Sequence, residues 1–168
     1  MGDATATDGE PVVRRQVARV ILLDERDRIL LFFYRDPRDE GYPGYWYLPG
    51  GGIEPRESPQ DAVRRELREE AGIEAAELGA VIHQRRGVTF RHEGRTFEQD
   101  EWHVVGWWPA GRLGPVDGDD AEAGSVAAHR WWSIEELDAS PDRVYPEDLV
   151  AIIRRLSLDH LRRSARDA

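Results

Sequence analysis

The sequence contains no cysteine, no lysine and no asparagine. Without cysteine the chain has no disulfide bond, no thiolate metal site and no cysteine nucleophile. Without lysine it has neither a Schiff-base lysine nor the lysine of a phosphate-binding P-loop, so all 23 basic residues are arginine. Without asparagine it has no N-glycosylation site. Any polar chemistry must rest on other groups, and the 33 carboxylates are the most numerous of them.

Long apolar runs are also missing. No run approaches the roughly 18 consecutive apolar residues of a membrane-spanning helix, and the first residues lack the apolar core of a signal peptide. We therefore expect a cytoplasmic protein with no membrane partner. The length of 168 residues fits one domain, and 40% hydrophobic residues with 9% aromatic ones are ordinary for a globular chain.

The formal net charge is −10. Such a charge argues against nucleic-acid binding through a basic surface, because the phosphate backbone binds clusters of positive charge. It would also repel a small polyphosphate substrate unless bound cations neutralised part of the field. The composition thus makes a polyphosphate substrate awkward without bound cations.

The most informative stretch runs from residue 46 to residue 73 and predicts a strand, a loop and a helix. Tyr45 to Leu48 is an aromatic and apolar run typical of a strand, and it ends in Pro49 and three glycines, which predict a loop. Ser58 is a good N-cap, followed by proline at the first helical position and an acid where a capping box would have one. Gly72 is a typical helix stop.

Three glutamates of this predicted helix, Glu66, Glu69 and Glu70, fall on one narrow arc. Like charges at these spacings repel by a few tenths of a kcal/mol per pair, so the arrangement does not stabilise the helix. A divalent cation would remove the repulsion, since Mg²⁺ prefers oxygen ligands and keeps positions for water and phosphate. The alternative is a solvated, charge-rich helix face without a ligand.

The spacing of residues around these glutamates resembles the Nudix box. Gly51 is followed after five residues by Glu57, and after seven more by Arg-Glu-Leu-Arg-Glu-Glu-Ala-Gly-Ile, which ends at Ile73. The resemblance implies that Glu66, Glu69 and Glu70 hold Mg²⁺ or Mn²⁺ and that Gly50 offers its carbonyl. It also implies that Glu57 pairs with Arg65 to fix the loop, and that Glu66 or Glu69 takes a direct part in catalysis.

The remaining pattern fits an α/β fold, a Nudix-type α/β/α sandwich with a mixed β-sheet between the box helix and a C-terminal helix. We expect a disordered tail over 1–11, one domain over 12–163 and a C-terminal tail over 164–168. The predicted elements are a hairpin over 12–34, long strands over 80–91 and 95–108, a strand over 128–132, a short helix from Ser133 and a helix over 146–163.

Further site residues are not set by spacing. A family member can use an additional acid from the second half of the fold, and the choices here are Glu98, Asp100, Glu101 and Glu122. Arg35 could contact a phosphate or form a surface ion pair. A base could stack on an aromatic ring of Phe33, Tyr45, Tyr47 or Phe90, although each of these also suits a core. The five histidines are scattered and are not assigned to a metal.

The expected function is metal-dependent hydrolysis of a phosphoanhydride in a nucleoside diphosphate linked to another group. A nucleoside triphosphate, including an oxidised one, is the default substrate, because motifs that mark other Nudix subgroups are absent. One alternative is a Nudix-fold nucleotide-binding module without catalysis. A Nudix-fold isomerase is disfavoured, because that branch relies on cysteine. The sequence leaves open whether the protein is a monomer or a homodimer.

Overall fold

The structure is a computed structural model that describes residues 11–35, 43–92, 95–109, 113 and 126–166. The strands are β1 (Val13–Leu23), β2 (Ile29–Tyr34), β3 (Tyr45–Tyr47), β4 (Gly50–Gly52), β5 (Glu77–His92), β6 (Arg95–Trp107), β7 (Val126–Trp132) and β8 (Val144–Tyr145). The helices are α1 (Pro59–Ala71), α2 (Ile134–Ala139), α3 (Leu149–Leu156) and α4 (Leu158–Arg166).

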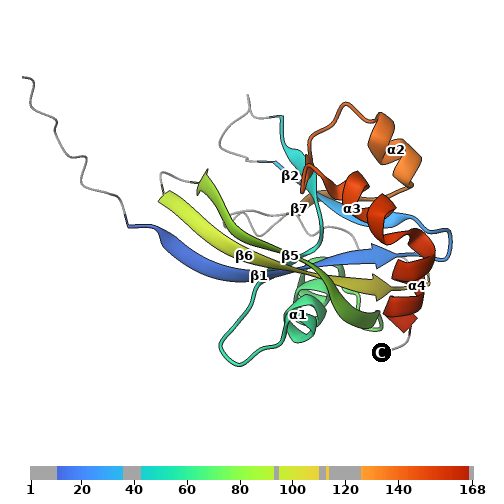
Figure 1. The fold of residues 1–168 in the computed structure, drawn as a ribbon, viewed down its shortest axis with the longest axis horizontal. Coiled ribbons are helices and arrows are strands. Elements are labelled where there is room, and N and C mark those ends of the chain that lie inside the picture. Colours follow the sequence, from blue (N-terminus) through green and yellow to red (C-terminus); the bar gives the residue numbers. More distant parts are fainter. Residues whose placement is uncertain (1–10, 36–42, 93–94, 110–112, 114–125, 167–168) are drawn as a thin grey trace, which may run out of the picture.

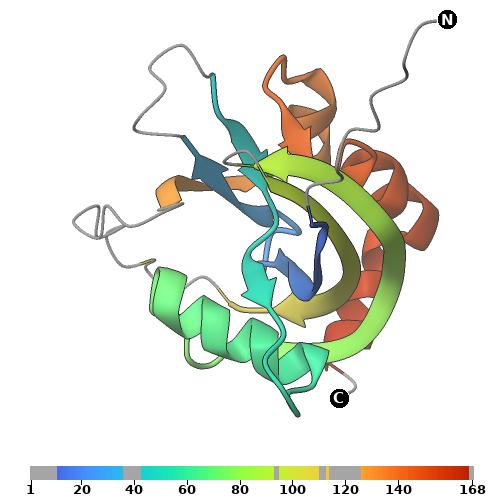
Figure 2. The same cartoon turned by 90° about the vertical axis from the view of Figure 1, so that its left-hand side faces the viewer.

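One mixed sheet contains all of these strands, and β1 lies at its centre. Along one edge β1 runs parallel to β6 over its full length, from Val13 opposite Phe97 to Leu23 opposite Trp107. Along the other edge it pairs first with β4 and then, at its end, with β2. The order is β5-β6-β1-β2-β3-β8, with β7 against β2. The sheet therefore curls around β1 (Figure 2), and residues of β4 and β8 line one pocket.

Helices cover the sheet from two sides. Helix α1 lies on one side, and the C-terminal helices α3 and α4 lie on the other (Figures 1 and 2). Alternate residues of β1 supply both cores, since side chains of a strand point to opposite faces. Val20 and Leu22 pack with α1, whereas Ile21 and Leu23 pack with α3 and α4. The predicted α/β/α sandwich with a mixed sheet is confirmed.

Helix α1 begins and ends at the predicted residues. The Ser58 hydroxyl accepts a hydrogen bond from the Asp61 amide at 3.1 Å, and Gly72 ends the helix at φ +64°. Its apolar face buries Ala62, Val63, Leu67 and Ala71 against the sheet. Glu66 and Glu70 lie on the arc between Ala62 and Val63, at the margin of this apolar face, whereas Glu69 is exposed. Burial of the apolar face therefore determines where the carboxylates lie.

Two predicted elements differ in the structure. The glycines at 50–52 form the short strand β4 and not a loop, because their backbone pairs with β1 from Val17 to Arg19. The single C-terminal helix is two helices, since Ser157 adopts φ +60°, a conformation that interrupts helical geometry. The break lets Ile152 and Ile153 of α3 and Leu161 of α4 reach the same core.

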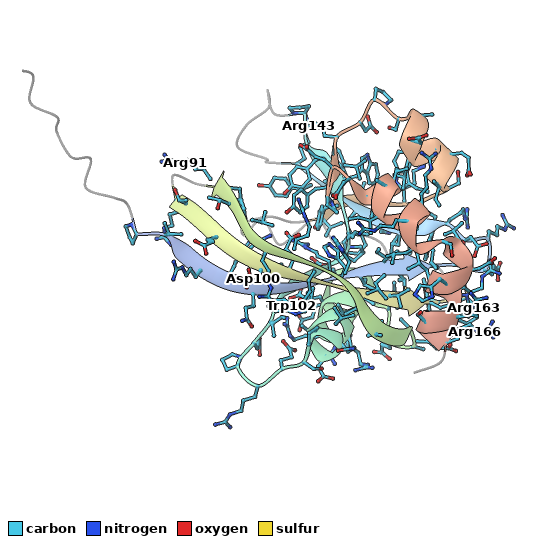
Figure 3. All side chains as sticks on the ribbon, in the orientation of Figure 1. Arg91, Asp100, Trp102, Arg143, Arg163 and Arg166 are labelled. Atoms are coloured by element: carbon cyan, nitrogen blue, oxygen red, sulfur yellow. The ribbon has the colours of Figure 1, made fainter. Side chains whose placement is uncertain are left out.

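The last helix extends past residue 163. Helix α4 continues to Arg166, whose guanidinium lies 4.8 Å from the ring centre of Trp107 (Figure 3). The start of β1 at Val13 lies next to the expected start at residue 12. Within the described residues, none of the helices has both the length and the apolar composition needed to cross a bilayer.

Candidate active site

Two glycines of β4 permit a close approach of strand and helix. Gly50 has φ +129°, and a Cβ at this residue would lie 2.1 Å from the carbonyl oxygen of Ala18. A Cβ on Gly51 would lie 2.3 Å from Oε1 of Glu66. Residues with side chains could not occupy these positions without displacing the backbone of β1 or the carboxylate of Glu66. The glycines thus place a strand backbone directly beside the acidic side of α1.

Glu57 and Arg65 form the predicted pair. The Arg65 Nε and Nη2 atoms each lie 3.0 Å from a different oxygen of Glu57, and Nη2 also donates to the Gly52 carbonyl at 2.7 Å. These contacts lower the pKa of Glu57 and raise the pKa of Arg65. A bidentate pair of this kind is geometrically specific, and here it ties the loop before α1 to β4 and to the helix.

Arg65 also engages the box carboxylates. Its Nη1 atom donates to Oε1 of Glu66 at 2.7 Å and lies 3.6 Å from Oε2 of Glu69. The side chain of Glu66 is 16% exposed, whereas that of Glu69 is 53% exposed. The three glutamates therefore do not share one environment. Glu66 and Glu70 line a pocket, and Glu69 does not belong to its lining.

Glu70 is the most constrained of the three. One carboxylate oxygen is buried without a hydrogen-bond partner, and the Gly50 amide donates to the carboxylate. Burial, reinforced by the charge of Glu66, raises the pKa of Glu70 to about 7. A buried anion with an unpartnered oxygen costs folding free energy, so this position favours a bound cation or proton.

The residues around Glu70 fit a hard divalent cation in their chemistry. Oxygen donors come from Glu66, from Glu70 and from the carbonyl of Gly50, the type of ligand that Mg²⁺ prefers. The Gly50 carbonyl now accepts a hydrogen bond of 2.7 Å from Nη1 of Arg19. In the described part of the chain, no three Asp, Glu or His side chains are already gathered at metal-binding distance. The fit thus rests on the donor types and on the unpartnered oxygen of Glu70.

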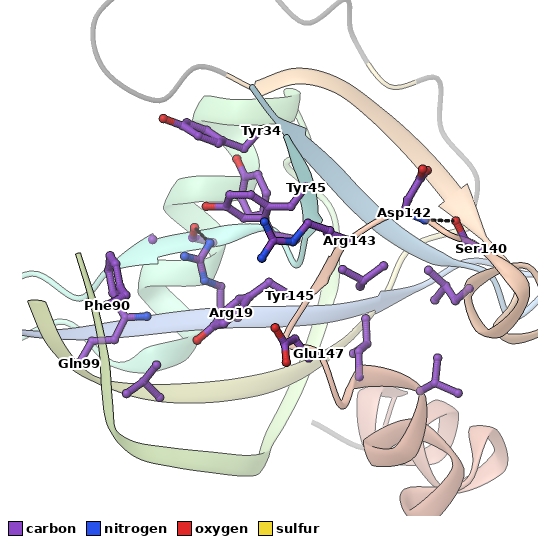
Figure 4. A pocket seen from close by; sticks show the side chains of 18 of the residues that line it. Arg19, Tyr34, Tyr45, Phe90, Gln99, Ser140, Asp142, Arg143, Tyr145 and Glu147 are labelled. Carbon is purple, nitrogen blue, oxygen red and sulfur yellow. Dashed lines mark hydrogen bonds between the residues drawn. The ribbon is translucent and has the colours of Figure 1, made fainter. Parts of the chain in front are cut away.

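The pocket above these residues has a volume of about 1100 Å³. Gly50, Gly51, Glu66 and Glu70 form one part of its lining. Aromatic and arginine side chains from β1, β2, β3, β5 and the segment around β8 form another part (Figure 4), which includes Arg15, Arg19, Tyr34, Tyr45, Tyr47, Phe90, Arg91, Arg143 and Tyr145. A pocket of this size that combines aromatic rings with charged groups of both signs is a candidate site for a small molecule.

Sequence reasoning identified some of these residues and missed others. Three of its four aromatic candidates, Tyr45, Tyr47 and Phe90, line the pocket, whereas Phe33 does not. It missed Arg15 and Arg19, although an arginine within an otherwise apolar strand is a usable signal. Arg19 is half-buried and its Nε has no partner. Arg35 is exposed and outside the pocket lining.

The further acids occupy different environments. Glu98 lies 3.7 Å from Arg14, and Asp100 accepts a hydrogen bond from the Gly87 amide at 2.9 Å. Glu101 is fully buried and accepts hydrogen bonds from Tyr145 and Gln99. None of these three belongs to the described lining of the pocket. Glu122 lies outside the described residues.

Comparison with known proteins gives the family. The NUDIX domain model matches residues 13–154. The chain is 38% identical to the CTP pyrophosphohydrolase of Escherichia coli over 90 residues, which are 54% of this chain and 63% of that protein. It is 30% identical to the RNA pyrophosphohydrolase of Erythrobacter litoralis over 152 residues, 84% of this chain and 87% of that protein.

Solved structures agree on the fold. The MutT protein from Methanosarcina mazei Go1 matches with a TM-score of 0.59 at 21% identity, over 88% of this chain and 94% of that one. The chain spans between 26% and 63% of the length of three of its curated relatives. The family model covers most of the chain, and the box geometry lies within it. The chain therefore belongs to the Nudix family.

Proposed function

We propose that the protein hydrolyses a phosphoanhydride bond of a nucleoside diphosphate linked to another group, with Mg²⁺ or Mn²⁺. The observation that carries the proposal is the unpartnered buried oxygen of Glu70 beside Glu66 and the Gly50 backbone, at one end of a pocket of about 1100 Å³. Membership of the Nudix family, with relatives named as pyrophosphohydrolases, supports the reaction type. A nucleoside triphosphate, including an oxidised one, is the default substrate.

Different residues of this chain would bind the cation and orient its ligands. Glu66, Glu70 and the Gly50 carbonyl would hold the cation, with Glu69 as the further ligand that the family resemblance implies. When bound, the cation neutralises diphosphate oxygens and lowers the pKa of a coordinated water. Arg65, held by Glu57, orients the Glu66 carboxylate through its hydrogen bond of 2.7 Å.

Two further assignments follow from the pocket lining. Sequence reasoning favours Glu66 or Glu69 as the direct participant, and of these two only Glu66 lines the pocket. We therefore assign to Glu66 the role of general base, which accepts a proton from the attacking water. Arg19 lies at the same end of the pocket, with its guanidinium 5.3 Å from the ring centre of Tyr47. It would contact the substrate phosphate oxygens.

The test is hydrolysis of a nucleotide panel with added Mg²⁺, with Mn²⁺, and with EDTA in excess. The panel contains the four nucleoside triphosphates, an oxidised purine nucleotide and a dinucleoside polyphosphate, and the readout is released phosphate or pyrophosphate. The proposal predicts turnover with either metal and none with EDTA. Full turnover in EDTA would refute it. Binding of nucleotides without turnover under every metal condition would favour the alternative, a nucleotide-binding module without catalysis.

A further inference from the structure

Arg15 is held in a fixed orientation on the pocket face of β1. It lies opposite Gln99 in the parallel ladder with β6, and its Nε donates to Oε1 of Gln99 at 2.8 Å. Its guanidinium also lies 5.3 Å from the ring centre of Phe90 and 5.0 Å from that of Phe97, two rings that stack on each other. Three contacts from two neighbouring strands thus fix the plane of the guanidinium.

A buried network determines which end of the Gln99 amide faces Arg15. The Nε2 atom of Gln99 donates to Oε1 of Glu101, so Oε1 of Gln99 is left as the acceptor for Arg15. Glu101 itself is fully buried and accepts from the Tyr145 hydroxyl at 2.6 Å and from Arg85 at 3.4 Å. Because a carboxylate can only accept hydrogen bonds, the amide cannot flip without losing both partners.

The free side of Arg15 faces the pocket. Arg15 belongs to the pocket lining, and its hydrogen bond to Gln99 uses Nε, which leaves Nη1 and Nη2 for a ligand. A guanidinium presents these two donors as a planar fork that suits two adjacent acceptors. Arg15 and Arg19 lie on the same face of β1, about 13 Å apart along the strand. Since Arg19 contacts the Gly50 carbonyl, this separation leaves room for a pentose and a base between the box and Arg15.

The walls of the pocket favour a base over a second phosphate group. The rings of Tyr45, Tyr145 and Phe90 offer faces on which a base can stack. Toward α2 and β8 the lining carries the carboxylates of Asp138, Asp142 and Glu147 and one guanidinium, that of Arg143. Asp138 is paired with Arg154 at 2.7 Å, but Asp142 and Glu147 still outnumber Arg143, so this part of the lining disfavours a polyanion (Figure 4). An uncharged, planar group with hydrogen-bond acceptors fits this lining best.

We propose that Arg15 is a specificity-determining residue that selects a nucleobase with two adjacent hydrogen-bond acceptors, guanine or cytosine. Guanine offers O6 and N7, and cytosine offers N3 and O2, whereas adenine and uracil alternate donors and acceptors along their edges. The inference rests on the proposed function for the location of the phosphates. It concerns base recognition alone and can fail independently of hydrolysis.

The test is equilibrium binding of GMP, CMP, AMP and UMP, measured by calorimetry, because monophosphates share the same phosphate and need no turnover. The wild type should bind GMP or CMP more tightly than AMP and UMP, by roughly 5- to 150-fold, the discrimination typical of a bidentate arginine contact. Comparison of GMP with CMP shows which of the two bases is preferred. If guanine is preferred, 7-deaza-GMP should bind more weakly than GMP, because it lacks the N7 acceptor. Equal or inverted affinities would overturn the proposal.

Two variants separate base recognition from charge. Arg15→Lys keeps the charge and removes the planar fork, so the preference for GMP or CMP should disappear while AMP binding changes little. Arg14→Lys is the matched control: Arg14 is the neighbouring residue on β1, faces the opposite side of the sheet and contacts Glu98. It should keep the wild-type preference. An Arg15→Lys protein that keeps the preference, or loses affinity for all four nucleotides equally, would contradict the proposal.

The two proposals give distinguishable results. Base preference without hydrolysis of any triphosphate would leave the assignment of Arg15 intact and refute the proposed reaction. Metal-dependent hydrolysis without base preference in wild-type binding would leave the reaction intact and refute the assignment of Arg15.

Discussion

At the scale of residues, Gly51 determines how closely Glu66 can approach the backbone of β4. We predict that Gly51→Ala folds but displaces the Glu66 carboxylate, because the new Cβ would lie 2.3 Å from Oε1, at the end of a movable side chain. Small misplacements of a catalytic group lower turnover by up to roughly a hundredfold. Metal-dependent turnover and a thermal melt measure the two effects separately.

The matched control for this change is Gly52→Ala. A Cβ on Gly52 would meet no atom within 4 Å, and this residue lies in the same strand. Turnover of Gly52→Ala should therefore stay near that of the wild type. Equal losses for the two variants would show that any side chain on β4 impairs the site, and the specific contact with Glu66 would have to be abandoned.

Glu57 contacts Arg65 and lies outside the described pocket lining, so its role should be structural. Glu57→Gln removes one of two charge-assisted hydrogen bonds, with an expected cost of about 1 kcal/mol in the free energy of unfolding. Turnover should fall less than in Glu70→Gln at saturating Mg²⁺. If Glu57→Gln were the more damaging change, Glu57 would belong to the reacting groups.

The sequence predicts the box residues well because their spacing determines their contacts. A glutamate that follows the glycine-rich segment can reach an arginine eight positions later on the helix, and Glu57 reaches Arg65. The outward position of Glu69 was not predictable, because the helical arc does not tell which carboxylate the sheet covers. Arg15 was also missed, since its role depends on Gln99 and Phe97 of β6, more than 80 positions later.

At the scale of elements, the start of α1 depends on a side-chain cap. The hydroxyl of Ser58 accepts from the Asp61 amide at 3.1 Å and donates to the Asp61 carboxylate at 2.6 Å. We predict that Ser58→Ala lowers the free energy of unfolding by about 1 kcal/mol, measured by urea denaturation. Ser133→Ala, which removes the cap of α2, should cost a similar amount.

These two variants differ in their expected effect on function. Helix α1 carries Glu66 and Glu70, whereas α2 carries no residue of the box. At temperatures well below the melting temperature, turnover should stay near the wild-type value in both variants, because neither capping serine belongs to the described lining of the pocket. An unchanged free energy of unfolding in Ser58→Ala would show that other contacts alone define the start of α1.

Elements with strong local signals were predicted, and those decided by tertiary pairing were not. Ser58 and Gly72 mark α1 through local chemistry. The strand character of Gly50–Gly52 comes only from pairing with β1, which no local propensity reveals. The C-terminal apolar pattern fits one helix, and the interruption at Ser157 follows from packing of two short helices on one curved sheet.

At the scale of the whole molecule, His103 makes stability depend on pH. Its ring is fully buried, its two nitrogens have no hydrogen-bond partner, and burial lowers the pKa of His103 to about 4. Glu101 opposes this shift, whereas His83, Arg19 and Arg85 reinforce it. In the unfolded chain the pKa of histidine is about 6.5, so the unfolded state binds the proton first as the pH falls.

Stability from His103 is therefore present above about pH 6.5 and is lost as the pH falls toward 4. Between pH 7 and pH 5 the loss should be about 2 kcal/mol in the free energy of unfolding. Urea denaturation at several pH values measures it, and His103→Gln should show a shallower decline over this range because glutamine does not titrate. Identical slopes for the two proteins would contradict the assignment.

The central claim is that α1 and β4 form a metal-dependent hydrolytic site at Glu70. The most direct measurement is turnover of a nucleoside triphosphate at saturating Mg²⁺ by wild type, Glu70→Gln and the exposed control Glu74→Gln. A melt with Mg²⁺ and a nonhydrolysable nucleotide reports binding, and the wild type should gain about 2.7 kcal/mol at a hundredfold excess over Kd. We predict that Glu70→Gln stays folded, loses most of that gain and loses turnover by roughly a hundredfold or more, while Glu74→Gln keeps both. A folded Glu70→Gln protein with near-wild-type hydrolysis would contradict the account.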